Sequence, residues 1–318
     1  MKQRALGKTG FQVSDVGHGL WGMGSWTGSD DEASRAALRL SIETGCNFFD
    51  SAFVYGNGLS DRLIGEVVRE YPTRPLVLAS KIPPADFRWP SSPAKKLHEV
   101  FPRAHVLDYA ERIRAAFGRP IDLLQFHVWE DAWAGEAEWQ DTVAELKASG
   151  AVKAFGISLN RGQPENGIAA IETGLVESVQ VIYNIFDQAP EDRLFPVCRA
   201  RKVGVIARVP LDEGSLGGKL TLATRFPAGD WRAGYFNPAN LAETVRRVDA
   251  LKALLPGDMS LAELALRFIL SEPAVSTLIV GMRTAAHVRE NLAVSDKGPL
   301  PAPLLAALRA HRWDRRTA

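Results

Sequence analysis

The chain has 318 residues, of which 46% are hydrophobic and 24% are charged. This composition suits one large core and excludes a disordered or fibrous protein. The 38 basic and 37 acidic residues leave a formal net charge of +1 and form no basic stripe. Neither nucleic acid nor an anionic membrane is therefore expected as a partner, and a small molecule is the expected ligand.

The cysteine content and the apolar runs bear on the cellular location. Cys46 and Cys198 are too few for a disulfide framework and lack the paired spacing of a zinc site, which indicates a reducing compartment. The chain opens with no basic-then-apolar leader and contains no run of about eighteen apolar residues. We therefore expect a cytoplasmic protein without a membrane span, and no oligomeric state follows from the sequence.

Residues 1–14 alternate in short segments around a turn at 7–10, which predicts a β-hairpin able to plug one end of the main fold. From residue 15 onward, strand-like apolar runs alternate with amphipathic helical runs in eight strand-then-helix units. The units are residues 15–20 with 31–44, 47–50 with 60–70, 76–81 with a long segment to 117, 121–127 with 135–149, 152–158 with 164–173, 178–183 with 190–201, 203–208 with 240–271, and 276–280 with 284–293.

Eight units with near-continuous apolar strands predict an α/β fold, a (β/α)8 TIM barrel with an N-terminal β-hairpin, as a single domain over residues 1–318. A doubly wound open sheet is the alternative. Against it, residues 19–24 are rich in glycine but no helix begins at their end, so these glycines serve either tight turns or ligand contact. The segments 82–105 and 209–239 are long, irregular loops, and loops of that length usually carry function.

Residues 50–61 read as the end of a strand, a loop and the start of a helix. Gly56 and Gly58 permit positive φ, and Ser60 is the expected N-cap of the helix. This places Asp50 and Tyr55 at the carboxyl end of a strand. Taken alone, the stretch is equally compatible with a turn that holds a capping Asp and a half-buried Tyr.

Ionisable residues end three consecutive predicted strands. Asp50 ends the second strand, with Tyr55 in the loop behind it, Lys81 ends the third and His127 ends the fourth. Active sites of such barrels lie at the carboxyl ends of the strands, so these four side chains are candidate catalytic residues. Each one alone is an ordinary solvated or rim residue, whereas three consecutive strands that end this way are not expected by chance.

The four residues suit carbonyl reduction. A phenol must lose about two to three units from its pKa near 10 to exchange protons near neutral pH. Lys81 beside Tyr55 would favour the phenolate, Asp50 would orient Lys81, and His127 would hydrogen-bond the substrate oxygen. The six histidines include no His-x-His pair, and no acidic cluster has metal-ligand spacing, so a metal-dependent hydrolase or lyase is the weaker alternative.

These motifs resemble the aldo-keto reductase family over nearly the whole chain. The family's Asp-x-Ala-x-x-Tyr-Gly motif matches residues 50–56, its strand-end lysine matches Lys81, and its Asp-Leu-Leu-Gln-x-His motif matches residues 122–127. The resemblance implies an NAD(P)H-dependent oxidoreductase on a (β/α)8 barrel, with a catalytic tetrad of Asp50, Tyr55, Lys81 and His127. It also implies Tyr55 as the general acid in reduction.

The resemblance also implies residues for the nicotinamide end of the cofactor. The segment 156–160 is similar to the family's Gly-x-Ser-Asn strand end, which implies that Ser158 and Asn160 hold the carboxamide. Gln180 and Tyr183 resemble the pair that binds the amide and stacks on the ring. Tyr183 is also compatible with a role as a core aromatic residue.

Residues 207–219 are similar to the family's pyrophosphate segment after the seventh strand. Arg208 and Val209 replace the usual Tyr and Ser, while the glycine and proline frame is kept. The cofactor contacts implied here are Arg208, Pro210, Leu211, Gly214, Leu216 and Lys219.

The segment 279–291 resembles the family's adenosine-phosphate site at the start of the eighth helix. Helix amides with Arg283 would favour a 2′-phosphate, which implies NADP, with NAD possible. His287 stands where many members have Arg, and Glu290 and Asn291 match the adenine contacts. Gly281 is the remaining cofactor residue expected in this segment.

Five aromatic residues fall in predicted rim loops. Trp21, Phe53, Trp89, Trp129 and Trp231 suggest an aromatic substrate pocket, although some of them can be loop core, and Trp21 is also a candidate cofactor contact. The particular carbonyl or alcohol substrate is left open. A second function class is a cofactor-sensing regulatory subunit, because potassium-channel β subunits resemble the same pattern.

Overall fold

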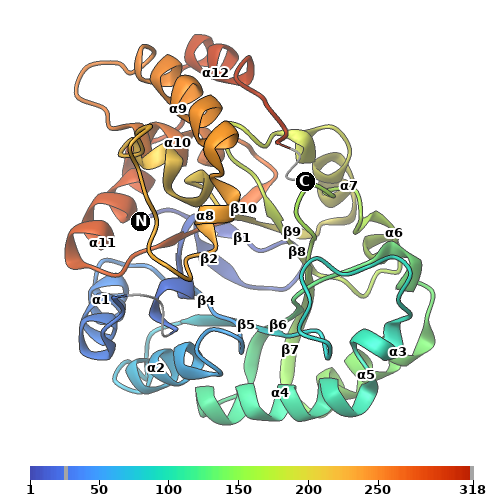
Figure 1. Cartoon of the computed structure of the whole chain (residues 1–318). Helices are drawn as coiled ribbons and strands as arrows, with labels where there is room; N and C mark the ends of the chain where they lie inside the picture. Colours follow the sequence, from blue (N-terminus) through green and yellow to red (C-terminus); the bar gives the residue numbers. More distant parts are fainter. Residues whose placement is uncertain (25–27, 316–318) are drawn as a thin grey trace.

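The computed structural model describes residues 1–24 and 28–315. Eight parallel strands close into a barrel in the order β10-β3-β4-β5-β6-β7-β8-β9 (Figure 1). The strands are β3 (Val16–Gly19), β4 (Phe48–Asp50), β5 (Val77–Ile82), β6 (Ile121–Phe126), β7 (Val152–Ser158), β8 (Ser178–Ile182), β9 (Gly204–Arg208) and β10 (Val275–Gly281). The predicted barrel is confirmed, and the open-sheet alternative is wrong.

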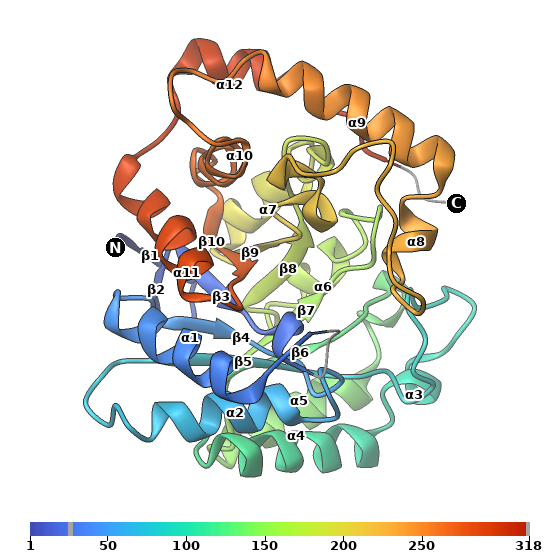
Figure 2. The same cartoon turned by 60° about the vertical axis from the view of Figure 1, so that its left-hand side comes forward.

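An outer layer of helices surrounds the barrel (Figures 1 and 2). Its members are α1 (Asp31–Glu43), α2 (Leu59–Val68), α4 (Arg103–Phe117), α5 (Ala137–Ala148), α6 (Ile168–Glu172), α7 (Leu194–Arg201), α10 (Leu261–Leu270) and α11 (Ala285–Leu292). Additional helices are α3 (Leu97–Val100), α8 (Arg232–Tyr235), α9 (Pro238–Lys252) and α12 (Ala302–Arg309), and the 3-10 helices are η1 (Trp21–Met23), η2 (Asp131–Trp133), η3 (Ala189–Glu191), η4 (Asp212–Gly217) and η5 (Ala293–Lys297).

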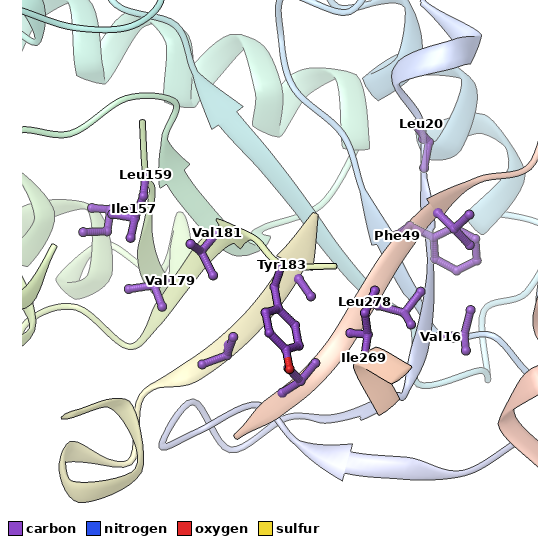
Figure 3. Close-up of a cluster of buried hydrophobic side chains, with 14 of the residues drawn as sticks. Val16, Leu20, Phe49, Ile157, Leu159, Val179, Val181, Tyr183, Ile269 and Leu278 are labelled. Atoms are coloured by element: carbon purple, nitrogen blue, oxygen red, sulfur yellow. The ribbon is translucent and has the colours of Figure 1, made fainter. Parts of the chain in front are cut away.

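The main core lies between the barrel strands and the helices. Neighbouring strands contribute Val16, Phe49 and Leu278 to it, and α10 contributes Ile269 (Figure 3). The parallel register places Leu278 beside Val16. Because helices cover the outer face and side chains fill the interior, both faces of each strand are buried, which explains the near-continuous apolar strand sequences.

The N-terminal hairpin closes the amino-terminal end of the barrel. Strands β1 (Gln3–Ala5) and β2 (Gln12–Ser14) pair in antiparallel fashion. Leu6 and Val13, both fully buried, join a core cluster with the strand residues Phe48 and Ile206. A Cβ on Gly204 would lie 2.7 Å from Leu6 Cδ1 and 2.9 Å from its carbonyl carbon, so only glycine fits against this plug. The predicted hairpin plug is confirmed.

Two local predictions are wrong. The segment 240–271 is two helices rather than one, because Pro256 and Gly257, with φ of 54°, lie between α9 and α10. The helix α2 begins two residues earlier than expected, with Gly58 as its N-cap at φ 81°, and Ser60 lies inside the first turn. Glycine reaches this left-handed conformation at low cost, and Ser60 is thereby free to bond elsewhere.

His18 on β3 makes stability sensitive to acid. Burial lowers the pKa of His18 to about 3, and its Nδ1 lies 2.8 Å from Ser41 Oγ. In the unfolded chain the His18 imidazole is protonated below about pH 6.5, whereas in the folded chain it stays neutral. The free energy of unfolding therefore falls as the pH drops below that value. Relative to a His18→Gln variant, the wild type should lose about 2 kcal/mol of unfolding free energy between pH 7 and pH 5. Urea unfolding of both proteins at the two pH values measures this, and a constant difference would contradict the assignment.

Candidate active site

The four candidate catalytic residues come together at the carboxyl end of the barrel. Asp50 is the last residue of β4, Lys81 lies near the end of β5, and His127 directly follows β6. The Lys81 ammonium donates to Asp50 Oδ2 at 2.6 Å and to the Ser51 carbonyl at 2.6 Å. Lys81 Nζ lies 5.4 Å from the centroid of the Tyr55 ring, whose own centroid is 6.0 Å from that of His127.

Two glutamines also hold Asp50. Gln180 Nε2 donates to Asp50 Oδ1 at 2.8 Å, and Gln125 Nε2 donates to the same oxygen at 3.3 Å. Gln125 was not among the residues predicted for the site. The sequence position of Gln125, two residues before His127, could have predicted it, because alternate residues of a strand point to the same side. Three donor side chains, including Lys81, therefore fix the carboxylate of Asp50.

The pKa of Tyr55 moves in the direction opposite to the sequence-based expectation. Burial raises the pKa of the Tyr55 hydroxyl, while the positive charges of Lys81 and Arg208 act to lower it. The predicted effect of Lys81 is therefore present but smaller than the cost of placing a phenolate in a low-dielectric site. At neutral pH Tyr55 keeps its proton, which a general acid requires.

His127 is a neutral imidazole at pH 7. Burial lowers the pKa of His127 well below its ordinary value, and the charges of Lys81 and Arg208 add to this effect. Its Nδ1 is buried without a hydrogen-bond partner among the described residues. The ring packs edge-on against Trp89, with centroids 5.4 Å apart. His127 can therefore offer a hydrogen bond to a molecule beside Tyr55.

A cavity of about 890 Å³ opens over these residues. Asp50, Tyr55 and His127 line it, and Lys81 is fully buried beside them. All eight barrel strands, through their carboxyl halves or the segments that follow them, contribute to the lining. Its volume falls in the range of roughly 300–1,000 Å³ that is typical of small-molecule sites.

Aromatic side chains form the mouth of the cavity. Trp21, Trp89 and Trp231 line it and are each about 40% exposed, at 40%, 43% and 39%, and the rings of Trp21 and Trp231 have centroids 5.9 Å apart. Phe53 also lines the cavity. Trp129 fits the loop-core alternative, because its ring is fully buried and packs 5.3 Å from that of Trp139 in the outer core.

Many of the predicted cofactor residues line the same cavity. They come from the loop after β3, from β8, from the end of β9 with its following loop, and from the end of β10 with the start of α11. These residues are Trp21, Gln180, Arg208, Pro210, Leu211, Gly214, Gly281, Arg283 and His287.

The structure places the other predicted cofactor residues outside the cavity lining. Tyr183 packs into the core (Figure 3), with its ring centroid 5.0 Å from that of Phe195, and donates from its hydroxyl to Glu191 at 2.6 Å. The structure therefore supports the core-aromatic alternative for Tyr183. Asn160 donates from its amide to Glu130 at 2.9 Å. The remaining residues outside the lining are Ser158, which is buried and pairs in register with Gln180, the fully buried Leu216, the exposed Lys219 and Glu290, and the buried Asn291.

The loop after β9 has a constrained backbone. Val209, Asp212 and Glu213 all have positive φ, at 56°, 43° and 54°, an unusual conformation for residues with a Cβ. The buried Asp212 carboxylate accepts from Tyr235 Oη at 2.7 Å and from Arg315 at 3.1 Å, which stabilises this conformation. Strain of this kind clusters at ligand sites, and backbone amides in such turns form concavities that bind anions.

Arg208 brings a positive charge to the cavity wall. Its Nη2 donates to the Leu159 carbonyl at 3.0 Å, while its Nε is buried without a hydrogen-bond partner among the described residues. Burial lowers the pKa of Arg208 to about 10, so the guanidinium is still charged at neutral pH. The nearby Glu213 forms an ion pair with Arg161. Arg208 is therefore suited to an anionic or carbonyl group of a bound molecule.

Comparison with known proteins identifies the family. The sequence profile described as "Aldo/keto reductase family" matches residues 15–312. The chain belongs to the aldo/keto reductase family. An aldo-keto reductase of Bacillus subtilis is 26% identical over 89% of this chain and 85% of its own. The NADH-specific methylglyoxal reductase of Escherichia coli is 25% identical over 92% and 93%, and a probable voltage-gated potassium channel subunit beta of Oryza sativa is 28% identical over 95% and 94%.

Solved structures of the family share the fold. The holo form of an aldo-keto reductase from Bacillus halodurans aligns with a TM-score of 0.76 at 24% identity, over 98% of this chain and 96% of that one. Family membership makes the chain a relative of oxidoreductases, as the sequence motifs implied. Within residues 1–24 and 28–315, no group of three His, Cys, Asp or Glu side chains could hold a metal ion. None of the helices in this part of the chain combines the length and apolarity needed to span a bilayer.

Proposed function

We propose that this chain is an NADP(H)-dependent oxidoreductase that interconverts an aldehyde or ketone with the corresponding alcohol. One observation carries the proposal: a buried Lys81–Asp50 ion pair lies beside a protonated Tyr55 at the wall of a cavity large enough for a small-molecule site. We also propose a cytoplasmic location, in keeping with Cys46 and Cys198, which are both buried and unpaired.

Tyr55 is the proposed general acid. Negative charge develops on the carbonyl oxygen as its carbon is reduced, and the Tyr55 hydroxyl gives its proton to that oxygen. Lys81, 5.4 Å from the centre of the phenol ring, stabilises the phenolate that forms, and Asp50 keeps the ammonium in place. In the oxidation direction the phenolate takes the proton back from the alcohol.

His127 orients the substrate oxygen. A neutral imidazole carries one N–H, and Nδ1 of His127 has no hydrogen-bond partner among the described residues. The N–H donates to the carbonyl oxygen and so holds it near the Tyr55 hydroxyl, where negative charge is stabilised as it develops. Because His127 is uncharged, it does not compete with Tyr55 as the proton source.

The cavity residues fit a nicotinamide dinucleotide, which would supply the hydride when bound. Arg283 and the amino-terminal end of α11 lie at one part of the lining and suit a phosphate. The positive-φ loop that contains Gly214 offers backbone amides for a second phosphate, and no heavy atom lies within 4 Å of a Cβ built on Gly214. Gln180, which bonds Asp50, and the Nε of Arg208, which has no partner among the described residues, are polar groups that suit the nicotinamide end.

Arg283 is the proposed reader of the 2′-phosphate. An Arg–phosphate pairing contributes roughly 1.5–3 kcal/mol, so Arg283→Ala should weaken NADPH binding by about ten- to a hundredfold and change NADH binding little. Fluorescence titration of both reduced cofactors measures the two affinities. Arg289→Ala is the matched control, because Arg289 is an exposed cation on α11, which begins two residues after Arg283, and lies outside the cavity lining. Equal losses for both cofactors in Arg283→Ala would exclude this role.

Turnover separates the proposed enzyme from the regulatory alternative. The similarity to a potassium channel subunit beta is the observation that favours a cofactor-sensing role. The purified wild type should consume NADPH when supplied with a panel of aliphatic and aromatic aldehydes, at a rate that saturates with aldehyde. Tight NADPH binding with no consumption for any aldehyde, and no NADP reduction by alcohols, would favour the regulatory role.

A further inference from the structure

A buried polar cluster lies behind the Lys81–Asp50 pair. It consists of Ser51, Ser60, Asp61 and Ser80, each at most 1% exposed. Ser80 Oγ donates to Asp61 Oδ1 at 2.9 Å, and the hydroxyls of Ser51 and Ser60 lie 2.5 Å apart. Ser60 and Asp61 belong to the first turn of α2, whereas Ser51 and Ser80 belong to the strand ends. We call these four residues the α2 clamp.

The α2 clamp holds both strand ends that carry the ion pair. Ser51 directly follows Asp50, and its carbonyl accepts from the Lys81 ammonium at 2.6 Å. Ser80 directly precedes Lys81 on β5, and strand alternation turns their side chains to opposite faces. Ser80 thus faces α2 while Lys81 faces the barrel interior, so the bonds to Ser51 and Ser80 fix the backbone on both sides of the ion pair.

Asp61 costs folding free energy in this position, so stability alone does not explain it. Its Oδ2 is buried without a hydrogen-bond partner in the described chain, and burial raises the pKa of Asp61 to about 6. At neutral pH the side chain is therefore a buried carboxylate with incomplete hydrogen bonding, which is costly. Lys81 is the nearby positive charge that opposes this rise in the pKa.

We propose that Asp61 is a positioning residue, which acts through Ser80 and through its charge to hold the Lys81 ammonium between Asp50 and the Tyr55 phenol. The proposal rests on the function proposed above and names a residue that the sequence motifs of the tetrad do not include. Asp61 touches neither substrate nor cofactor, because it is fully buried outside the cavity lining.

The test is a double-mutant cycle on kcat. Asp61→Asn keeps the side-chain volume and removes the charge, and it should lower kcat by about ten- to a hundredfold, since small misplacements of catalytic groups have effects of this size. KM and the Kd for NADPH should stay within about twofold, because binding groups are untouched. Ser80→Ala should lower kcat less than Asp61→Asn does. The double variant should have the same kcat as Asp61→Asn, because both changes remove the same Ser80–Asp61 hydrogen bond.

Asp122→Asn is the matched control. Asp122 is a buried carboxylate at the opposite end of the barrel, where it accepts from the Leu78 amide at 2.9 Å and pairs with Lys153 at 2.7 Å. It should lower the melting temperature while kcat stays at the wild-type value. If Asp61→Asn lowers the melting temperature as Asp122→Asn does but keeps wild-type kcat, the positioning role is wrong.

A second measurement needs no turnover, so it separates this proposal from failure of the proposed function. In 15N-lysine NMR, the Lys81 ammonium is assigned by its loss in Lys81→Met, and its proton exchange with water is measured. Exchange should be slow in the wild type and in Asp122→Asn, and about tenfold faster in Asp61→Asn, because a loosened ammonium loses its acceptors more often. Equal exchange in all three proteins would overturn the positioning role, whether or not the wild type reduces carbonyls.

Discussion

Replacing Tyr55 with phenylalanine is expected to lower kcat for carbonyl reduction by roughly a hundredfold to ten-thousandfold. The change removes the hydroxyl that gives its proton to the substrate oxygen and keeps the ring that packs against His127, with centroids 6.0 Å apart. Because that hydroxyl has no proposed part in holding the cofactor, the Kd for NADPH should be nearly unchanged. Steady-state kinetics and fluorescence titration of the same preparation give both quantities.

Tyr109→Phe is the control for the Tyr55 variant. The Tyr109 ring packs edge-on against the cavity residue Phe53, with centroids 4.8 Å apart, but Tyr109 does not line the cavity. Loss of this hydroxyl should leave kcat within about twofold of wild type, as expected away from reacting atoms. If Tyr55→Phe also kept kcat within that range, Tyr55 would not be the general acid.

Replacing Lys81 with methionine is expected to reduce both activity and stability. Among the described residues, the change leaves the buried Asp50 carboxylate with only the amide donors of Gln125 and Gln180. Breaking a buried ion pair in this way costs about 3–5 kcal/mol. The pKa of Tyr55 should rise further, because the charge of Lys81 is a cause that lowers it. Alcohol oxidation needs the phenolate, so the acidic limb of its pH profile should move to higher pH.

Lys153→Met is the matched control for the Lys81 variant. Lys153 also pairs with a buried aspartate, Asp122, but at the other end of the barrel and with a side chain that is 47% exposed. It should have little effect on the pH profile or on kcat. An unshifted oxidation profile in a folded Lys81→Met protein would exclude Lys81 as the cation that tunes Tyr55.

The barrel and the convergence of the four candidate residues were predictable because both follow from local patterns. Strand and helix periods repeat eight times, and a parallel barrel brings all strand ends to one face. Asp50, Lys81 and His127 lie at or next to strand ends, so their convergence follows from the fold. The structure adds the register and the bonds that no pattern specifies, such as those from Gln125 and Gln180 to the Asp50 carboxylate.

Two residues for which both a site role and a core role were open lie where the chain leaves regular structure. Tyr183 follows β8 by one residue, and the path of the chain there turns its ring toward α7 and α10 instead of the cavity. Trp129 turns outward in the same way two residues after His127. Tyr183 continues the alternation of β8, because Val179 and Val181 share its outward face and Gln180 faces inward. Trp129 breaks the alternation of β6, so the side on which it emerges depends on tertiary packing.

The direction of the Tyr55 pKa shift also required the structure. The sequence identifies Lys81 as a neighbouring cation, but the balance between its charge and the burial of the phenol depends on how fully the surrounding loops cover the ring. The conformation of the strained loop with Val209, Asp212 and Glu213 also depends on a distant part of the chain, because Arg315, about a hundred residues away in sequence, donates hydrogen bonds to Asp212. Neither property is encoded within a short stretch of sequence.

Direct observation of hydride transfer is the most decisive test of the proposed function. NADPH deuterated at its hydride-donating carbon is mixed with an aldehyde that the wild type consumes, and the product is analysed by mass spectrometry and proton NMR. For the wild type we predict one deuterium on the carbinol carbon of the alcohol. At an equal protein concentration, Tyr55→Phe should transfer the label more slowly, by the same factor by which its kcat is lowered. Alcohol without deuterium, or label transfer at an equal rate in both proteins, would contradict hydride transfer coupled to proton donation by Tyr55.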